Sequence, residues 1–182
     1  MIHVRHEHCA VAAAMAYSRK TLDVGVATGT YGPGLSQLMT ALPIAVRAHL
    51  PLVIFAGEVL LKSGWYNQGI DQARLVTATG ARYHSLHHIP RMGEAVRDAF
   101  FEARRDRVPV VIGVPFDLQN QTIRLPEHLP EASASLMPLM SPIPPHPDGI
   151  RKAANLIEQS DRIVVLAGMG AVEADAAGAC RA

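Results

Sequence analysis

A single carboxylate opens the first helix-like segment of the chain. Glu7 stands between His6 and His8, where a run of small and apolar residues begins. Negative charge at the amino end of a helix is stabilised by the helix dipole, which gives Glu7 an ordinary structural explanation. A carboxylate in this position is also suited to hydrogen-bond a bound cofactor. The remaining residues decide between these two interpretations.

A glycine-rich turn follows the first strong strand pattern. The sequence GTYGPG occupies residues 29–34, between the apolar run DVGVAT and a helix-like segment. No Gly-Lys-Ser/Thr follows it, so the turn is not a phosphate-binding P-loop. Its glycines permit positive φ angles and a close approach of the backbone to a ligand. A tight strand-to-helix turn without a ligand is the alternative interpretation.

Other polar residues favour structural interpretations. Asp71 falls in the first turn of a short helix, and His87 and His88 read as part of a surface loop. We expect Asp117 to cap the turn after the last strand. The AGMG sequence at 167–170 is a poor dinucleotide fingerprint, because it lacks a third glycine at the required place.

Composition excludes several classes of protein. The 182 residues are 49% hydrophobic with a formal net charge of +1, and no run of like charge indicates a nucleic-acid or membrane partner. Cys9 and Cys180 lie far apart and have no metal-type spacing, which favours a reducing compartment and predicts no metal site. The first residues lack the apolar core of a signal peptide, and no stretch is long enough to span a bilayer. We therefore expect a soluble, cytoplasmic protein.

Strand-like and helix-like segments alternate along the first two thirds of the chain. Apolar, β-branched runs alternating with helical patterns predict a parallel sheet with helices on both faces, an α/β fold. The expected strands are 2–4, 23–28, 51–57, 81–86 and 108–115, and the expected helices are 7–20, 35–49, 70–79 and 90–105. The helix from residue 7 is apolar nearly all round, which predicts that it is buried. Pro43 is expected to kink its helix.

The amino-acid composition of the chain changes after residue 120. Proline-rich residues 121–147 predict an extended interdomain linker. A helix over 148–160, a strand over 162–168 and a helix from 171 then predict the opening of a second, Rossmann-like domain. Residues 1–120 form the expected first domain and residues 148–182 a partial one, so the sequence looks cut at both ends.

Five motifs in order resemble one family. They are VRHEHCAVAAAMAYSR, VGVATGTYGPG, LPLVIFAGEV, IDQARLV and VPVVIGVPFDLQ, and together they span residues 2 to about 120. The chain resembles the amino-terminal, pyrimidine-binding domain of thiamine-diphosphate enzymes, and most of all the acetolactate synthase group. The segment 148–172, with IVVLAGMGA, is similar to the start of the central domain of that family.

The resemblance implies a catalytic and cofactor-binding role for Glu7. In such enzymes a glutamate at this position hydrogen-bonds N1′ of the aminopyrimidine ring, and the shared proton favours the 4′-imino tautomer. The imino group then removes the proton from C2 of the thiazolium ring. The protein supplies position and a proton relay, and the cofactor carries the carbanion chemistry. With all five motifs present, the cofactor interpretation of Glu7 is favoured over the helix-dipole one.

The same resemblance assigns further site residues. It places Gly32, Pro33 and Gly34 against the pyrimidine ring and the substrate channel. Tyr31 and Gln37 replace a serine and an asparagine that are frequent in the family, and this implies an altered substrate pocket.

Aligned on the flanking alanine, Asp71 falls where acetolactate synthases carry a glutamine near cofactor and substrate. A slip of one residue would place Gln72 there instead. An acid at this point would repel a carboxylate substrate such as pyruvate, so the departure puts acetolactate synthesis itself in doubt. An ordinary helix start at Asp71 is the equally weighted alternative.

The resemblance implies thiamine diphosphate and Mg²⁺ as cofactors, with diphosphate and metal held by a carboxyl-terminal domain that lies outside this sequence. That domain normally belongs to a partner subunit, which implies a homo-oligomer or a partner chain that carries it. The expected substrate is a small 2-oxo acid, undergoing carboligation or decarboxylation. FAD is not expected on this chain, and the isolated chain is expected to be inactive.

Two alternatives remain open. The chain is either a non-catalytic partner of a split thiamine-diphosphate enzyme or, less in keeping with the motifs, an unrelated nucleotide-binding α/β protein that uses AGMG.

Overall fold

The computed structural model describes residues 1–62, 65–122, 129–138 and 143–180. The chain divides into two compact units, Met1–Pro138 and Leu139–Ala182. In the described part of the chain, no helix is long and apolar enough to cross a membrane.

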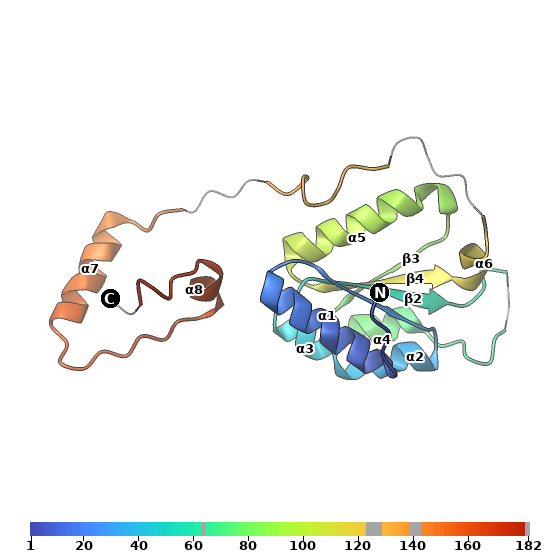
Figure 1. Ribbon diagram of the computed structural model, residues 1–182, viewed down its shortest axis with the longest axis horizontal. Coiled ribbons are helices and arrows are strands. Elements are labelled where there is room, and N and C mark those ends of the chain that lie inside the picture. Colours follow the sequence, from blue (N-terminus) through green and yellow to red (C-terminus); the bar gives the residue numbers. More distant parts are fainter. Residues whose placement is uncertain (63–64, 123–128, 139–142, 181–182) are drawn as a thin grey trace. The chain divides into compact units, whose positions relative to one another are not determined.

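The first unit is built on a four-stranded, fully parallel sheet. The strand order is β1-β2-β4-β3, with β4 hydrogen-bonded to both β2 and β3. This arrangement confirms the predicted α/β fold, and Figure 1 shows helices on both faces of the sheet. The strands are β1 (Gly25–Gly29), β2 (Leu52–Glu58), β3 (Arg82–Ser85) and β4 (Pro109–Pro115). The strand expected at residues 2–4 is wrong, because this exposed segment has no strand partner.

One face of the sheet carries most of the helices. Side chains from α1, α2, α3 and α4 pack with the sheet in one core that includes Val11, Leu35, Leu42 and Val76. The single helix expected over 35–49 is instead three short pieces, and Pro43 lies in the first turn of the last piece, where proline is tolerated. The elements on this face are α1 (Glu7–Thr21), α2 (Pro33–Ser36), the 3₁₀ turn η1 (Gln37–Thr40), α3 (Leu42–Arg47) and α4 (Gln72–Ala78).

The opposite face is covered by one long helix. The 3₁₀ turn η2 (Ile89–Arg91) leads into α5 (Met92–Asp106), which lies across the sheet from α1 in Figure 1. Ala99 and Ala103 of α5 pack with Val53 and Ile112 in a second core. The short helix α6 (Phe116–Gln119) follows β4 directly.

The first helix is less buried than its composition predicts. Only Val11, Ala14 and Ser18 of α1 are buried, at the spacing of one helical face. Most other side chains are partly or fully exposed, and they include Tyr17, which is 52% exposed. Alanine side chains supply little apolar area, so an alanine-rich helix need not be covered all round. The prediction of a buried helix is therefore wrong on its outer face.

Part of the proline-rich segment packs on the first unit. Ser133 is buried, and the Arg104 side chain on α5 donates a hydrogen bond from Nε to its Oγ over 3.4 Å. The position of a Cβ on Gly93 would lie 3.3 Å from the ring of Pro130. These contacts hold a stretch near 130–133 against α5. Residues 123–128 and 139–142 of the expected linker lie outside the described residues.

The described residues of the second unit contain two helices. They are α7 (Pro147–Glu158) and α8 (Met169–Glu173). The strand expected over 162–168 does not form within the described part of the unit, and Val164 and Leu166 are almost fully exposed. A strand needs a hydrogen-bonded neighbour, and none of the described residues supplies one to this run. The described residues therefore do not confirm the expected Rossmann-like unit.

Candidate functional site

Glu7 is the first residue of α1 and is half-buried. His6 caps the helix, because its Nδ1 accepts a hydrogen bond from the backbone N–H of His8 over 3.1 Å. The Thr30 hydroxyl donates a hydrogen bond to Glu7 Oε1 over 3.4 Å. This contact places the carboxylate of Glu7 beside the turn that follows β1.

Glycine is required in this turn by close contacts. Gly32 has a φ of 59°, and a Cβ there would lie 2.2 Å from the carbonyl oxygen of Gln68. A Cβ on Gly34 would lie 1.9 Å from Thr30 Oγ1 and 3.0 Å from Glu7 Oε1. The two glycines thus keep backbone, threonine and carboxylate close together.

Gln72 is a buried amide that joins three parts of the first unit. Its Oε1 accepts a hydrogen bond from the Gly32 N–H over 2.8 Å. Its Nε2 donates to the Gly57 carbonyl and to the Tyr83 hydroxyl, each over 3.0 Å. One side chain therefore ties the glycine turn to the end of β2 and to β3.

Glu58, the last residue of β2, has a fixed carboxylate. The Tyr83 hydroxyl donates to Oε1 over 3.0 Å, and the Ser85 hydroxyl donates to Oε2. Burial raises the pKa of Tyr83, and the neighbouring Glu58 charge raises it further, so the phenol keeps its proton as a donor. Gly113 permits this packing, because a Cβ there would lie 2.2 Å from the Tyr83 hydroxyl oxygen.

A cavity of about 190 Å³ lies at the carboxyl ends of the strands. The Tyr31 hydroxyl donates to the Tyr66 hydroxyl over 2.6 Å on its wall, and this hydrogen bond raises the pKa of Tyr31. The cavity is lined by Tyr31, Glu58, Val59, Leu60, Tyr66 and Phe116. The carboxyl ends of parallel strands are where ligands bind in open α/β sheets.

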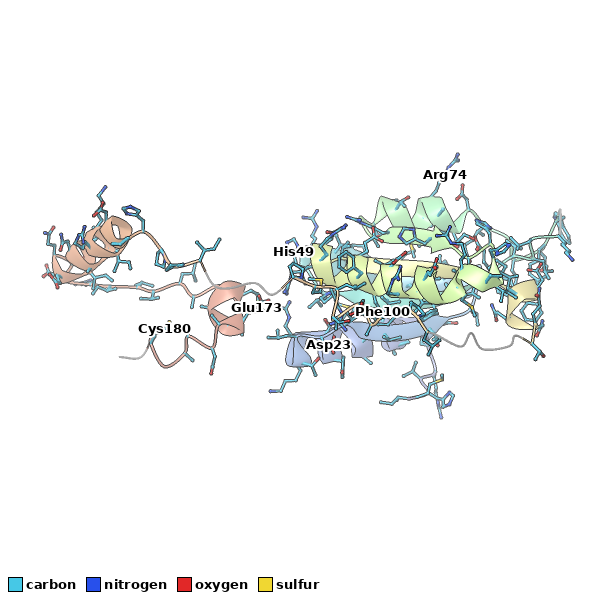
Figure 2. The ribbon with its side chains drawn as sticks, turned by 90° about the horizontal axis from the view of Figure 1, so that it is seen from above. Asp23, His49, Arg74, Phe100, Glu173 and Cys180 are labelled. Carbon is cyan, nitrogen blue, oxygen red and sulfur yellow. The ribbon has the colours of Figure 1, made fainter. Side chains whose placement is uncertain are left out.

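The structure places the neighbouring residues Asp71 and Gln72 in different environments. Asp71 is the exposed N-cap of α4, where Oδ1 accepts the Arg74 backbone N–H over 3.1 Å and Oδ2 pairs with Arg74 Nε over 3.2 Å. Figure 2 shows Arg74 projecting outward from the first unit. Asp71 thus has the geometry of a helix start and does not line the cavity, whereas Gln72 points inward.

The other candidate residues from the sequence also fall into two groups, those that line the cavity and those that are exposed away from it. Tyr31 lines the cavity. Pro33 is the exposed first residue of α2, and Gln37 is exposed at the C-terminal cap of that helix. His87 and His88 are exposed. The structure therefore brings Tyr31 to the cavity and leaves Pro33 and Gln37 on the outside of the turn.

The sequence predicts that Asp117 caps the turn after β4, but its described side-chain hydrogen bond reaches another loop. Its Oδ1 accepts the backbone N–H of Leu61 over 3.2 Å, so it fastens the loop after β2 to α6. In the second unit, Gly168 is the N-cap of α8, and no strand precedes it among the described residues. The AGMG sequence therefore does not form a strand-to-helix nucleotide turn there. No group of three metal-ligating side chains occurs within the described ranges.

Glu58 was missed by sequence reasoning. Its signal is its position, because a charged residue directly after the buried run LVIFAG stands at the carboxyl end of a central parallel strand. Tyr66 and Phe116 carry no comparable signal, since only folding brings their segments to the same cavity.

Comparisons with known proteins identify the family. Residues 1–75 match the family model described as the thiamine pyrophosphate enzyme, N-terminal TPP binding domain. The chain therefore carries the amino-terminal domain of the thiamine-diphosphate-dependent enzymes. Within that class it falls in the acetolactate synthase-like family, in agreement with the sequence prediction.

The similarity to acetolactate synthases runs along most of the chain. The chain is 32% identical over 180 residues to the acetolactate synthase large subunit of Parasynechococcus marenigrum, and the alignment covers 94% of this chain and 28% of that protein. It is 31% identical over 177 residues to a probable large subunit of Methanocaldococcus jannaschii, covering 94% and 30%. Isozyme 3 of Escherichia coli is 29% identical over 174 residues, with the same coverage. The chain spans less than a third of the length of these relatives.

Proposed function

We propose that this chain binds the aminopyrimidine end of thiamine diphosphate and serves an enzyme that acts on small 2-oxo acids by carboligation or decarboxylation. The observation that carries the proposal is the half-buried Glu7 carboxylate, held against the glycine turn by Thr30. The family match over residues 1–75 and the relatives named acetolactate synthase support it.

The residues around Glu7 fit a flat cofactor ring. Gly34 has no room for a side chain beside Thr30 and Glu7, so glycine lets the backbone of the turn pack directly against both side chains. When bound, thiamine diphosphate supplies the carbanion chemistry at the substrate carbonyl. Glu7 would hold a proton at the ring nitrogen N1′, and Gly32 and Gly34 would position the turn against the ring. Thr30 would orient the Glu7 carboxylate.

We infer that turnover also requires a domain that holds the diphosphate and Mg²⁺. The support is the length of the named relatives, of which this chain matches under a third. That domain would come from a second copy of a longer chain or from a separate subunit. Similarity along 94% of the chain supports the related proposal that residues 148–182 belong to a following central domain.

The cofactor proposal is tested by saturation-transfer NMR with thiamine diphosphate and the full chain. We expect signals from the pyrimidine protons of the cofactor, weakened about tenfold or more in Glu7→Gln, because a hydrogen bond to a charged group contributes about 1.5–3 kcal/mol. Glu94→Gln is the matched control, since Glu94 is the first-turn acid of α5. Equal signals from both variants would return Glu7 to a purely structural role.

The partner-subunit alternative predicts a different result. A stable complex with a chain that carries the domain for the diphosphate and Mg²⁺, together with full activity of the complex in Glu7→Gln, would show that this chain assists without taking part in the chemistry.

A further inference from the structure

The cavity at the ends of the strands has a negative wall. Of the six lining residues, Glu58 carries the only charge, and none of the six carries a positive one. Val59, Leu60 and Phe116 contribute apolar surface, while Tyr31 and Tyr66 contribute phenol oxygens. A carboxylate that entered this space would meet a like charge without a cation to offset it.

The Glu58 carboxylate is held in place rather than merely exposed. Tyr83 and Ser85 of β3 each donate a hydroxyl hydrogen to one of its oxygens. A Cβ on Gly113 would lie 2.8 Å from Glu58 Oε2 and still closer to the Tyr83 hydroxyl, so the strand beneath leaves no space for either group to move inward. A carboxylate oxygen has two lone pairs, and each oxygen of Glu58 therefore keeps acceptor capacity for a ligand.

The remaining wall adds a hydrogen-bonding group and a fixed rim. Tyr31 donates its hydroxyl hydrogen to Tyr66, which leaves the Tyr66 hydroxyl hydrogen available to a ligand. Asp117 accepts the Leu61 N–H and so anchors the loop that carries Leu60. At about 190 Å³, the cavity lies below the range of about 300–1,000 Å³ that is typical of drug-sized ligand pockets, and it suits a molecule of a few heavy atoms.

We propose that this cavity binds a small, uncharged carbonyl compound that bears a hydroxyl group, and that Glu58 excludes carboxylates from it. The hydroxyl group donates to Glu58, the Tyr66 hydroxyl donates to the carbonyl oxygen, and the apolar residues cover the carbon chain. The inference rests on the proposed function in one respect: it identifies the cavity with the position of the second, acceptor substrate. A 2-oxo acid would then serve only as the first substrate. Discrimination arises from repulsion of the wrong ligand as much as from attraction of the right one.

Hydroxyacetone and pyruvate test this inference, because they differ only where one carries a hydroxymethyl group and the other a carboxylate. Saturation-transfer NMR on the full chain should show hydroxyacetone binding at least tenfold more tightly than pyruvate. In Glu58→Gln the preference should fall at least tenfold, mainly through a gain in pyruvate binding. Glu94→Gln removes an acid from the first turn of α5 and should leave the preference unchanged.

A second variant covers the case in which Glu58→Gln does not fold. Tyr66→Phe removes only a hydroxyl group and should weaken hydroxyacetone binding severalfold without strengthening pyruvate binding. Pyruvate binding as tightly as hydroxyacetone to the unaltered chain, or unchanged ligand preference in both variants, would overturn the inference.

The same samples separate this inference from the cofactor proposal. Thiamine diphosphate signals that depend on Glu7, together with no cavity selectivity, would overturn the inference alone. Cavity selectivity without any dependence of cofactor signals on Glu7 would overturn the cofactor proposal and keep the cavity as a binding site without an assigned acceptor role.

Discussion

The apolar runs PVVIGVP and RIVVLAG lie one in each unit and share two valines, an isoleucine and a glycine, yet only the first is a strand. In Met1–Pro138, β4 is hydrogen-bonded on both sides, and Val110, Val111 and Ile112 are buried. In Leu139–Ala182, the run 162–168 has no strand neighbour among the described residues, and its side chains are exposed. An apolar run thus becomes a strand only where neighbouring elements satisfy its backbone hydrogen bonds and cover its side chains.

The largest expected change in stability comes from shortening an apolar side chain in the first unit, compared with the same kind of substitution in the second unit. Ile54→Ala removes a fully buried side chain of β2 and should lower the free energy of unfolding by about 4 kcal/mol, because it leaves a cavity in the core. Leu166→Ala, at a side chain 97% exposed, should change it by less than about 0.5 kcal/mol. Urea denaturation of both variants makes the comparison. A large loss in Leu166→Ala would mean that the second unit buries this run in solution.

A smaller loss of stability is expected when Gln72 is replaced, and Gln159 in the second unit serves as its control. Gln72→Leu leaves the Gly32 N–H, the Gly57 carbonyl and the Tyr83 hydroxyl without their partner, which should cost about 2 kcal/mol of unfolding free energy. Gln159→Leu replaces an exposed residue at the end of α7 and should be nearly neutral. The denaturant midpoints of the two variants measure both effects. Equal shifts of the midpoint would show that the hydrogen bonds of Gln72 do not stabilise the first unit.

An acid-dependent effect of about 1 kcal/mol is expected from Glu102 of α5. Burial acts to raise its pKa, but hydrogen bonds from His84 and Arg82 together bring the pKa below its usual value. A lowered folded-state pKa adds stability that is present above about pH 4.5 and is lost as the pH falls through the folded value.

Glu102→Gln should therefore flatten the decline in unfolding free energy between about pH 5 and pH 3. Its control is Glu94→Gln, which removes an exposed pair with Arg91. Denaturation at several pH values measures both slopes. An unchanged slope in Glu102→Gln would show that other carboxylates govern acid sensitivity.

The smallest expected change in stability comes from removing side chains that cap the first turn of a helix. Asp71→Ala removes the side-chain cap of α4 and should cost about 0.5–1 kcal/mol across the whole first unit, since α4 unfolds with its core. His146→Ala removes the cap of α7 and should raise amide exchange only within that helix. Hydrogen exchange measured residue by residue separates a global from a local response.

Periodicity predicted the parallel α/β fold of the first unit well. The buried strands 51–57 and 108–115 were placed within one residue, because both-sided burial leaves an unmistakable apolar run. The ends of helices were predicted less accurately where a proline interrupts the helical pattern. Pro43 lies at such a point and divides a predicted helix. The strand at 162–168 failed because its local pattern carries no information about whether a neighbour is present.

The candidate site was only partly accessible to sequence. Motif order pointed to Glu7 and the glycine turn, which lie together in the structure. It gave no way to tell that Asp71 faces outward while Gln72 faces inward, because a shift of one residue on a helix changes direction by about 100°. Glu58 gained its importance from hydroxyl groups on β3, which lies far along the chain and is brought close only by the sheet.

The hydrogen bonds of the two carboxylates lead to different parts of the first unit. Glu7 is held by Thr30 of the glycine turn, and Glu58 by Tyr83 and Ser85 of β3. Gln72 joins these two parts, because it accepts a hydrogen bond from Gly32 in the turn and donates one to Tyr83. In evolutionary terms, descendants that diverge at the end of β2 keep the start of α1 undisturbed only while Gln72 retains both partners.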